Sequence, residues 1–460
     1  MAITPPLHTY SDTIVALATP AGSGAIAVIR LSGIDAIAIC NNVFKGKDLS
    51  LQSSHTIHFG IIRDGSEIID EVLVSLFVAP NSYTKENSAE ISVHASGYII
   101  ERVMQLLVKH GARPAKPGEF TLRAFLNGAM DLSQAEAVAD LIASNSAASH
   151  QVAMQQLRGG FSNKLKQLRE QLINFASLIE LELDFSEEDV EFANRDQLKN
   201  LVLQINHVLH QLISSFEQGN VLKNGVPVVI AGKPNVGKST LLNALVNEER
   251  AIVSEIAGTT RDSIEDVINI QGITFRFIDT AGIRDTQDII EAKGVERTRE
   301  KLKQARLILY LADPSQDNSD SIRAQLDEIS TLQIPILTVV NKSDLLSPDS
   351  RQSFAKLSPV FIAAKDQTGV EDLKEELIRK VQLDRISTDD VMVTNIRHVD
   401  ALKKTATSLE KVLFGIDNFI TSDFLALDIR QALHHLGEIT GSVSTEDLLD
   451  NIFSKFCIGK

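Results

Sequence analysis

The first region of the chain alternates short apolar stretches with turn-forming residues. Up to about residue 125, runs rich in β-branched residues recur, and Gly, Pro and Asn separate them. Such runs predict β-strands, here over residues 13–18, 25–31, 72–78 and 89–94. Helix-like spacing intervenes near Asp35 and from Ile99 to Lys109. The mixture predicts a small α+β domain.

The second region has a helical texture. From Ser133 to Gly219 almost no proline or strand signal interrupts the chain. Apolar residues recur there at alternating spacings of four and three, which predicts long amphipathic helices. One stripe consists of Phe161, Leu165, Leu168, Leu172, Phe175 and Ile179, and another of Leu198, Leu201, Ile205, Val208 and Leu212. We interpret both stripes as the core of a helical bundle.

The pattern changes again after Val221, where strand-like and helix-like stretches alternate up to about Asp384. The strand-like stretches are nearly continuous apolar runs, as expected of parallel strands that are buried on both faces. They cover residues 226–231, 274–279, 305–311, 334–340 and 359–363. Helical texture returns after Val391 and continues to the C-terminus. The pattern therefore predicts an α/β domain inserted into a helical one, whose two halves flank it in the sequence.

The composition is that of an ordinary core-forming protein. Hydrophobic residues make up 43% of the 460 residues and charged residues 23%. No apolar run is long enough to span a bilayer, and the N-terminus lacks the pattern of a signal peptide. Cys40 and Cys457 are the only cysteines, which excludes a disulfide framework and favours a reducing cytoplasm. The net charge of −15 argues against nucleic-acid binding through a general basic surface, although a local basic patch or a basic partner stays compatible with it.

Residues 232–239 read Gly-Lys-Pro-Asn-Val-Gly-Lys-Ser and match the phosphate-binding loop pattern G-x-x-x-x-G-K-[ST]. The motif follows an apolar run and precedes a helix-forming stretch that begins at Thr240. In that context the backbone N–H groups of the loop face phosphates at a helix N-terminus. Lys238 supplies a charge to the outer phosphates, and Ser239 supplies a hydroxyl to Mg²⁺. The motif predicts nucleotide binding.

Three further motifs follow in order, each after a predicted strand. The first, Asp279-Thr-Ala-Gly282, is suited to hold Mg²⁺ through water and to offer a backbone N–H to the γ-phosphate. The second, Asn341-Lys-Ser-Asp344, provides a carboxylate for the N1–H and amino group of guanine. Adenine would leave that carboxylate unsatisfied at a cost of roughly 1–3 kcal/mol, so Asp344 selects GTP over ATP. The third, Ala363-Ala-Lys365, offers a backbone N–H to the guanine oxygen. The set resembles the translation-factor-related class of small GTPases, which implies a Ras-like P-loop domain with a doubly wound sheet.

The segment between the phosphate-binding loop and Asp279 is the expected switch. Thr260 is the candidate second hydroxyl on Mg²⁺. Residue 283 is Ile, whereas Ras-like enzymes use a Gln there to orient water. Another group must therefore position the nucleophile. Glu291 is the candidate, and the alternative is a solvated charge near the start of the predicted helix 292–303.

Two sources of positive charge are available near the phosphates. The side-chain oxygen of Asn235, together with backbone oxygens from residues 254–259, is suited to a monovalent cation. Such a cation places positive charge where an arginine finger acts. Arg261 is the competing candidate for that charge, with an ordinary salt bridge as its alternative.

The sequences that flank the α/β region resemble those of the MnmE/TrmE family of tRNA modification GTPases. The resemblance covers essentially the whole chain, and it is carried by residues 12–24, 117–128 and 131–138 and by the terminal Cys457-Ile-Gly-Lys460. It implies three domains. They are an N-terminal α+β domain that binds folate and dimerises (1–125), a discontinuous helical domain (126–220 and 385–460) and an inserted G domain (221–384).

For the activity, the resemblance implies a cytoplasmic, potassium-dependent GTPase. Hydrolysis of GTP drives two G domains together across a homodimer and changes the conformation. The resemblance also implies a FAD-dependent partner, MnmG (also called GidA), which joins the homodimer in a heterotetramer. The substrate of the complex is tRNA, and no membrane association is expected. The product carries an aminomethyl or carboxymethylaminomethyl group on carbon 5 of the wobble uridine, and 5-formyltetrahydrofolate or a related reduced folate gives the one-carbon unit.

Carried over position by position, the resemblance also assigns residues to roles. The potassium shell is Asn235, Ser254, Ile256 and Thr259, the Mg²⁺ ligands are Ser239 and Thr260, the catalytic residue is Glu291, and the folate-binding residues are Arg30, Glu90 and Lys460. The GTP-binding positions are Asn235, Val236, Gly237, Lys238, Ser239, Thr240, Ser254, Glu255, Ile256, Ala257, Gly258, Thr259, Thr260, Asp279, Thr280, Ala281, Gly282, Asn341, Lys342 and Asp344. Because Arg30 and Glu90 lie in or near predicted strands, a simple ion pair is the alternative for them.

One position departs from the family. The family usually carries Lys or Arg after Leu-Asn-Gly, and here residue 129 is Ala. Loss of that basic contact would weaken folate binding by about 1–3 kcal/mol if the pair is partly buried, unless another cation compensates. Cys457 matches the family's C-terminal cysteine, which the resemblance places at the folate site with a candidate role in the modification. A thiol near a chain end is otherwise usually inert.

Two alternatives and one exclusion complete the interpretation. A regulatory switch, such as a ribosome-assembly GTPase, shares the missing Gln and the cation-ready Asn235, but such proteins usually append an RNA-binding module or a second G domain, and neither pattern is seen. A dimer scaffold with a degenerate G site conflicts with the intact nucleotide motifs.

His207, His210 and the pair His434-His435 have no third ligand in register, so we expect helix-surface or core histidines rather than metal sites.

Overall fold

The computed structural model describes residues 11–22, 24–184, 194–247, 265–278, 305–381 and 391–459. The chain forms two compact units. The first consists of Met1–Ala139, Gln156–Leu209 and Asp400–Lys460, and the second of Asp140–Gln155 and His210–Val399. Residues 140–155, 210–220 and 391–399, which the sequence led us to expect in the helical domain, thus group with the α/β part of the chain.

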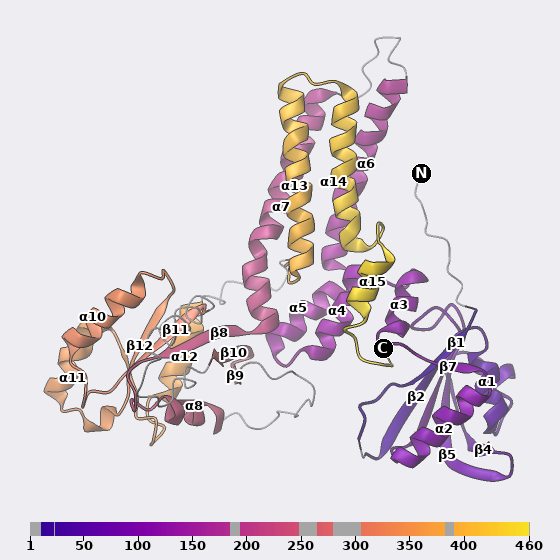
Figure 1. Cartoon of the computed structure of the whole chain (residues 1–460), viewed down its shortest axis with the longest axis horizontal. Coiled ribbons are helices and arrows are strands. Elements are labelled where there is room, and N and C mark those ends of the chain that lie inside the picture. The colour runs from indigo at the N-terminus through magenta and orange to yellow at the C-terminus, as the bar shows by residue number, and fades with distance from the viewer. Residues whose placement is uncertain are drawn as a thin grey trace, which may run out of the picture. The chain divides into compact units, whose positions relative to one another are not determined.

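A seven-stranded sheet forms the N-terminal part of the first unit (Figure 1). Its strand order is β3-β4-β5-β6-β2-β1-β7. β7 pairs in parallel with β1, and all other neighbours are antiparallel. The strands are β1 (Thr13–Leu17), β2 (Ile26–Ser32), β3 (Phe44–Lys45), β4 (Thr56–Asp64), β5 (Glu67–Phe77), β6 (Ser88–His94) and β7 (Ala112–Pro114). The four strands that the sequence predicted in this region are confirmed as β1, β2, β5 and β6.

Two helices, α1 (Ala36–Val43) and α2 (Gly97–Lys109), pack on one face of this sheet. Alternate strand residues enter the core beneath them, which explains why β5 buries Val72, Val74 and Leu76. The predicted helix over residues 99–109 corresponds to α2. β4 escaped prediction because its exposed residues are apolar, as at Phe59, while its buried ones include a histidine. That pattern inverts the usual alternation on which strand prediction depends.

Long helices follow the sheet, as the sequence predicted for residues 133–219 and for the chain after Val391 (Figure 1). α6 packs along α14. Arg195, at the start of α7, donates to Glu182 of α6 and to Ser422 of α14, so it joins three helices at one end. The helices are α3 (Glu119–Leu126), α4 (Leu132–Ala143), α5 (Ala147–Leu157), α6 (Gly160–Asp184), α7 (Arg195–Asn224), α13 (Ile396–Asp417), α14 (Ser422–Thr440) and α15 (Glu446–Phe453).

The buried faces of α6 and α7 differ slightly from the predicted stripes. Along α6 the predicted residues are buried except Phe175, which is half-buried beside a buried Ala176. Along α7 the buried face is centred one residue away from Leu201 and Val208, which lie half-buried at its edge. The buried residues of α7 are Leu198, Val202, Ile205, Leu209 and Leu212. The helical periodicity thus predicted both helices correctly. For α7 it placed the centre of the buried face one residue from its observed position.

The second unit contains a six-stranded sheet in the order β13-β12-β11-β8-β10-β9. β9 is antiparallel to β10, and the other neighbours are parallel. The strands are β8 (Val226–Ala231), β9 (Glu265–Ile270), β10 (Ile273–Ile278), β11 (Leu307–Ala312), β12 (Ile336–Val340) and β13 (Val360–Phe361). The helices are α8 (Lys238–Asn247), α10 (Ser319–Ser330), α11 (Pro348–Phe354) and α12 (Val370–Val381), with a short 3₁₀ turn, η4, over Ser343–Leu345.

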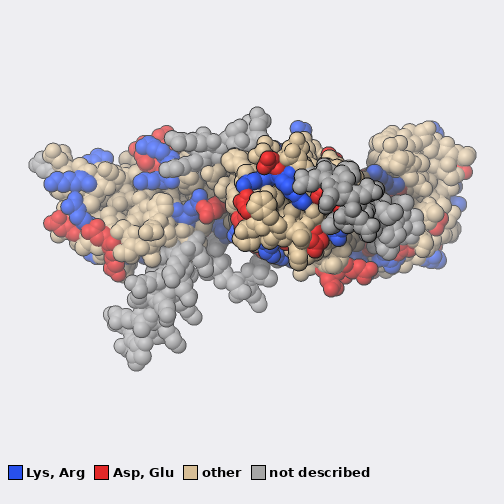
Figure 2. Space-filling view, turned by 90° about the horizontal axis from the view of Figure 1, so that it is seen from above, with Lys and Arg blue, Asp and Glu red and all other residues tan. Residues whose placement is uncertain are grey.

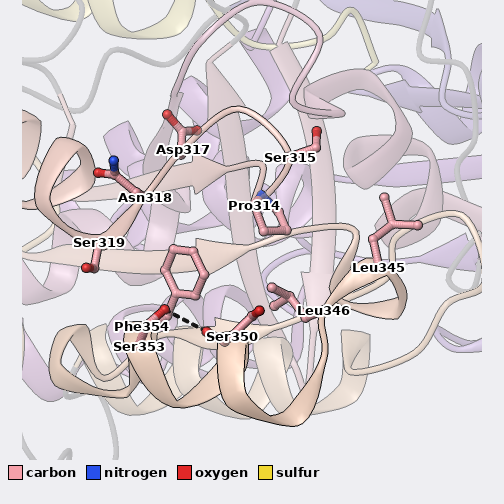
Figure 3. Close-up of a pocket in the computed structure, with 10 residues that line it drawn as sticks. All are labelled: Pro314, Ser315, Asp317, Asn318, Ser319, Leu345, Leu346, Ser350, Ser353 and Phe354. Atoms are coloured by element: carbon pink, nitrogen blue, oxygen red, sulfur yellow. Dashed lines mark hydrogen bonds between the residues drawn. The ribbon is translucent and has the colours of Figure 1, made fainter.

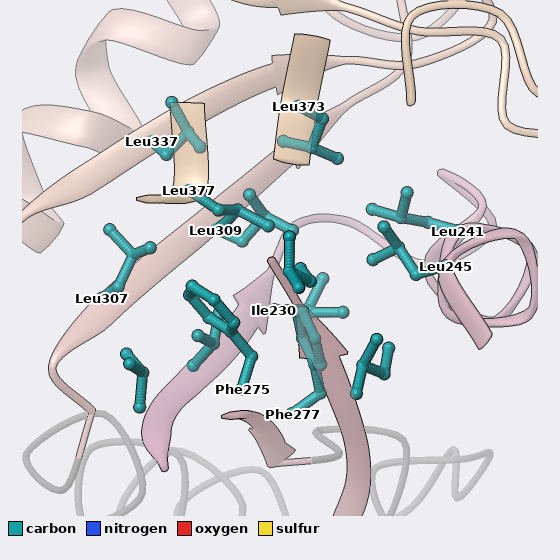
Figure 4. Packing of buried hydrophobic residues seen from close by; sticks show 14 of the residues in the cluster. Ile230, Leu241, Leu245, Phe275, Phe277, Leu307, Leu309, Leu337, Leu373 and Leu377 are labelled. Atoms are coloured by element: carbon teal, nitrogen blue, oxygen red, sulfur yellow. The ribbon is translucent and has the colours of Figure 1, made fainter. Parts of the chain in front are cut away.

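The parallel strands are buried on both faces, which accounts for their nearly continuous apolar sequences. On β11, Leu307 and Leu309 point into a core shared with α8 and α12, which Figure 4 shows from close by. Ile308 and Tyr310 point the other way, toward α10 and α11. Helices on both faces and parallel central strands make this a doubly wound α/β sheet. The carboxyl ends of the strands are therefore the expected place for a ligand.

Candidate nucleotide-binding site and folate site

The phosphate-binding loop connects β8 to α8 and is shaped by two glycines. Gly232 has a φ of +143°, and a Cβ there would lie 2.2 Å from the carbonyl oxygen of Leu311. Gly237 has a φ of +98°, and its Cβ would lie 2.3 Å from Nδ2 of Asn341. Neither position tolerates a larger residue without displacing its neighbour. Ser239 and Thr240 lie in the first turn of α8, where backbone N–H groups and the helix dipole favour anions.

The lysine of the loop is also in place. Nζ of Lys238 donates to the carbonyl oxygen of Gly232 at 2.8 Å, so the ammonium lies across the mouth of the loop. Asn235 has a positive φ of 63° and an exposed side chain, while Val236 is fully buried and anchors the loop in the core. The predicted residues of this loop are thus brought together at the carboxyl end of β8.

Asn341 joins three loops of the site. Its Nδ2 donates to the carbonyl oxygen of Val236 at 2.8 Å, and its Oδ1 accepts from the backbone N–H of Ala364 at 3.1 Å. The side chain is 3% exposed, so both bonds are shielded from water. The sequence suggested a contact with the base for this motif. The structure adds that Asn341 fixes the spacing between the phosphate-binding loop and the segment predicted to meet guanine.

Lys342 forms a second connection. Its Nζ lies 2.6 Å from Oδ2 of Asp313 and 3.5 Å from the carbonyl oxygen of Asn235. Burial alone would raise the pKa of Asp313, but hydrogen bonds from Lys342 and Ser315 outweigh it and hold the pKa below its ordinary value. The pair is therefore charged and ties the end of β11 to the phosphate-binding loop.

Asp313 is a site residue that sequence reasoning missed. It follows β11 directly, and the signal that was available is an aspartate at the carboxyl end of a predicted parallel strand. Asp317, a few residues later, lies 2.6 Å from Nζ of Lys233 in the phosphate-binding loop. The loop before α10 thus holds the phosphate-binding loop through two lysine–aspartate pairs.

Asp344 lies in the η4 turn and is exposed, so its carboxylate is accessible to a ligand. The backbone N–H of Ser343 donates to the carbonyl oxygen of Ile362 at 3.0 Å, so this turn and the Ala363–Lys365 segment lie side by side. A hollow of about 640 Å³ adjoins the turn (Figure 3). It is lined by residues of the loop before α10, by Leu345 and Leu346 and by α11, and by no residue of the phosphate-binding loop. This hollow is therefore distinct from the predicted nucleotide-binding loops.

Several predicted residues lie outside the described residues, so their roles stay predictions. These are Ser254, Glu255, Ile256, Ala257, Gly258, Thr259, Thr260, Arg261, Asp279, Thr280, Ala281, Gly282, Ile283, Glu291 and Lys460.

The two folate candidates in the sheet of the first unit form an ion pair. Arg30 of β2 and Glu90 of β6 are cross-strand partners, and Nε of Arg30 lies 2.8 Å from Oε1 of Glu90. The guanidinium carbon lies 5.8 Å from the ring centroids of Tyr83 and Phe120. The ion pair that was the alternative interpretation of these two residues is therefore present in the structure. Both side chains keep about a quarter of their surface exposed, at 23% and 27%, so the pair is also open to a ligand.

The C-terminal segment lies against the same strands. The carbonyl oxygen of Gly459 accepts from Nη1 of Arg30 at 3.4 Å, and that of Cys457 accepts from the backbone N–H of Gly118 at 3.3 Å. Gly459 has a φ of +95°, and a Cβ there would lie 2.3 Å from the carbonyl oxygen of Leu17. The side chain of Cys457 is exposed. Cys457 thus lies two residues before Gly459, whose carbonyl oxygen contacts Arg30, and its role at a folate site stays a prediction.

A buried charge cluster supports this region. The side chain of Arg123 is fully buried and pairs with Asp12, Glu86 and Glu119. Arg113 shares two of these partners, with Nη2 2.6 Å from Oε1 of Glu119 and 2.8 Å from Oδ2 of Asp12. The cluster connects the start of β1, the loop before β6 and helix α3. Glu86 lies in the loop before β6, so its ion pair with Arg123 fixes that loop against β1 and α3.

The expectation that His434 and His435 have no third potential ligand in register was wrong. Glu438 provides the third group that we did not find in the sequence, since its carboxylate lies 3.6 Å from Nε2 of His434 and 3.1 Å from Nδ1 of His435. The three potential ligand atoms lie within 4.8 Å of one another. Positions three and four residues apart on α14 face the same side of a helix, and this register was overlooked. His207 and His210 are exposed on α7, as expected.

Charge and hydropathy add two observations. On the face drawn in Figure 2, acidic and basic side chains are interspersed in small groups rather than gathered into one basic field. Among the helices that the structure describes, none is both long and apolar enough to cross a bilayer.

The doubly wound sheet and the glycine-shaped phosphate-binding loop between β8 and α8 are those of a P-loop GTP-binding protein. Comparison with known proteins shows which family of GTP-binding proteins this chain belongs to. A family model described as "GTP-binding protein TrmE N-terminus" matches residues 13–129, and one described as "MnmE helical domain" matches residues 132–457. The chain belongs to the MnmE (TrmE) family of tRNA modification GTPases, and it is a GTP hydrolase that acts in tRNA modification.

The curated relatives cover nearly the whole chain. "tRNA modification GTPase MnmE" of Cytophaga hutchinsonii is 57% identical over 452 residues, which are 98% of this chain and 98% of the relative. The proteins of the same name from Christiangramia forsetii and Bacteroides thetaiotaomicron are 55% and 52% identical, over 98% of this chain and 99% of each relative. Among solved structures, a variant of Aquifex aeolicus Era bound to GDP·AlF₄⁻ matches over 40% of this chain and 66% of that chain at 26% identity, with a TM-score of 0.28, which adds nothing to the assignment.

Proposed function

We propose that this GTPase depends on potassium. The observation that supports the proposal is Asn235, whose left-handed backbone and exposed amide stand in a loop that lysine–aspartate pairs hold in place. A neutral amide oxygen suits a monovalent cation. Asn235, Ser254, Ile256 and Thr259 would hold the ion, which supplies positive charge beside the phosphates, as an arginine finger does in related enzymes.

The remaining roles at the nucleotide follow from the same proposal. Ser239, at the start of α8, and Thr260 would hold Mg²⁺, and Asp279 would reach it through water. Lys238 binds the outer phosphates, and Asp344 selects guanine. Glu291 orients the attacking water, because an apolar residue follows the Asp-Thr-Ala-Gly motif where other GTPases have a glutamine.

The dependence on potassium gives a direct prediction. GTP turnover at equal ionic strength should be severalfold faster in K⁺ than in Na⁺, and Asn235→Ala should remove that ratio. Asn243→Ala is the matched control, since it truncates an exposed asparagine on α8 just beyond the loop. Steady-state phosphate release measures both. Equal rates of the unaltered protein in the two salts would refute the proposal.

We propose that the first unit binds a reduced folate beside Arg30 and Glu90. A reduced pterin presents ring N–H groups that a carboxylate accepts, and Glu90 is a partly exposed carboxylate held in orientation by Arg30. The rings of Tyr83 and Phe120 flank the guanidinium, and Cys457 belongs to the C-terminal segment whose Gly459 contacts Arg30. The donor set therefore fits a pterin. When bound, the folate supplies the one-carbon unit.

The active assembly, in this proposal, is a homodimer that joins MnmG, a FAD-dependent protein, in a heterotetramer. The open face of the sheet supports dimerisation, since Ile57, Phe59 and Leu73 on β4 and β5 are 65%, 66% and 46% exposed. Neighbouring exposed apolar side chains on a sheet face are typical of an association surface. GTP hydrolysis then brings two G domains together and drives a conformational change in the assembly.

The product of the assembly is a wobble uridine with an aminomethyl or carboxymethylaminomethyl group on carbon 5. Cells that lack this protein should therefore lose those nucleosides from their tRNA, and the unaltered gene should restore them while an Asp344→Asn variant should not. Mass analysis of digested tRNA measures the change. If the modified uridines persist in the deletion strain, the reaction assigned to this chain is wrong, whatever the GTPase kinetics show.

A further inference from the structure

Lys85 adopts a backbone conformation that is unfavourable for a lysine. Its φ is +59°, in the left-handed region that glycine enters without penalty and other residues rarely do. Such conformations persist where the surroundings impose them, and they concentrate at functional sites. The residue lies in the loop between β5 and β6, two positions after Tyr83.

The surroundings do impose it. On one side of Lys85, the carbonyl oxygen of Thr84 accepts from Nδ2 of Asn127 at 2.8 Å, and the Thr84 hydroxyl lies 2.6 Å from that of Ser32. On the other side, Glu86 accepts from Ser32 at 2.7 Å and from the buried Arg123 at 3.3 Å. The backbone is held before and after Lys85, so the direction of its side chain is set.

That direction brings the ammonium to the end of α3. Nζ of Lys85 donates to the carbonyl oxygen of Gly128 at 2.7 Å. Gly128 closes the helix with a φ of +67°, and the backbone N–H of Ala129 donates back to the carbonyl oxygen of Ala124 at 2.8 Å. Lys85 therefore places a positive charge one residue before the position at which the family usually carries Lys or Arg. The side chain of residue 129 is exposed here but is only a methyl group.

Other basic groups of the region are less suited to a ligand. Arg123 is fully buried among three carboxylates, and Arg113 is engaged by Asp12 and Glu119. Lys85 is exposed, and an ammonium has three donors, of which Gly128 takes one. The carboxyl end of a helix also favours a cation over an anion, so an anionic ligand there needs an ammonium beside it.

The loop that carries Lys85 also reaches the pterin candidates. Tyr83 turns its ring to Arg30, which holds Glu90, and Lys85 turns its ammonium to Gly128. One short, rigid loop thus contributes an aromatic group beside the carboxylate that suits a pterin ring and a cation that suits a carboxylate tail. A reduced folate has a pterin at one end and a glutamate at the other.

We propose that Lys85 replaces the basic residue missing at position 129 and binds the glutamate tail of the folate. The inference rests on the proposed folate site. Lys85 acts on affinity for the tail and is not a catalytic residue.

Titration calorimetry with 5-formyltetrahydrofolate, and with a tetrahydropterin that lacks the tail, tests the inference on the full chain. Lys85→Gly removes the ammonium and suits the backbone, so the fold is retained. We expect it to weaken folate binding about tenfold and to leave tetrahydropterin binding unchanged. Ala129→Lys in the same variant should restore folate affinity to within about threefold, because a charge-assisted contact is regained. Lys116→Ala, which removes an exposed lysine just before α3, should bind as the unaltered protein does.

The outcomes separate the two proposals. If the unaltered chain binds the folate and Lys85→Gly binds it equally well, the role of Lys85 is wrong and the folate site stands. The same conclusion holds if Lys116→Ala, and not Lys85→Gly, loses affinity for the tail. If the unaltered chain binds neither folate nor tetrahydropterin, the proposed folate site itself is wrong and the inference falls with it.

Discussion

Replacing Gly237 by alanine is expected to weaken nucleotide binding severely. The new Cβ would lie 2.3 Å from Nδ2 of Asn341, and the residue would be held at a φ of +98° that alanine rarely adopts. The neighbour is a buried side chain fixed at both ends by hydrogen bonds to Val236 and Ala364, so it has no room to yield. The phosphate-binding loop must therefore shift, and its backbone N–H groups no longer converge on the phosphates.

We expect GTP affinity to fall at least about 100-fold, which corresponds to the loss of two or more charge-assisted hydrogen bonds. Titration calorimetry with GDP and steady-state GTP turnover measure the loss. Gly97→Ala is the matched control, because nothing lies within 4 Å of the added methyl group at the start of α2. Normal GDP affinity in the Gly237→Ala variant would show that the observed loop geometry is not the one that binds nucleotide.

Replacing Arg123 by methionine is expected to lower the free energy of unfolding by about 3–5 kcal/mol. Methionine keeps much of the volume of the side chain and removes its charge. Asp12, Glu86 and Glu119 then lose a fully buried partner, and Glu119 is itself only 5% exposed. Arg113→Met is the control, since it removes the same charge from two of the same carboxylates at a site that is 39% exposed. That loss should be about 1 kcal/mol.

The effect of pH distinguishes lost charge from lost packing. Burial alone would raise the pKa of Glu119, but hydrogen bonds from Arg113 and the backbone of Lys116, with the nearby arginine charges, hold the pKa below its ordinary value. Asp12 behaves in the same way, its pKa lowered against the effect of burial by Arg113 and Arg123. A carboxyl whose folded pKa is depressed contributes stability above its unfolded pKa and loses it as pH falls.

The difference in unfolding free energy between the unaltered protein and Arg123→Met should therefore stay constant from neutral pH down to about pH 5. It should narrow from about pH 5 to about pH 2, as the carboxylates are protonated. Denaturant titration of the full chain, followed by circular dichroism, measures it. A difference that stays constant over this range would assign the loss to packing and contradict the electrostatic explanation.

The sequence predicted the parallel strands of the second unit well because both of their faces are buried. Side chains such as Leu309 and Ile308 enter different cores, so every position is apolar and the run is unmistakable. β4 had no such signal. Its exposed face carries Ile57 and Phe59, and its buried face includes His58, so the alternation points the wrong way. What a strand buries depends on which elements cover each face, and a local window does not contain that information.

The nucleotide site shows the same division. The glycine, lysine and serine of the phosphate-binding loop were recognised because their spacing is local. Asp313 was missed, because its role depends on an ion pair with Lys342, which follows a different strand. Nζ of Lys342 lies 2.6 Å from Oδ2 of Asp313 only once the sheet has formed. The third member of the histidine group, Glu438, was within reach of the sequence, because helical register alone brings it to His434.

The sequence by itself determined the class of this protein: a phosphate-binding-loop motif, further motifs typical of GTPases, and flanks that indicate a tRNA modification GTPase. Those features are short runs whose residue types and spacing act within one turn or loop. The tertiary structure decided which distant groups meet. It buried Arg123 among carboxylates from three segments, made Asn341 a connection between loops, and turned Lys85 toward the end of α3. Contacts between residues far apart in the chain depend on topology and packing, and no local pattern of residues specifies them.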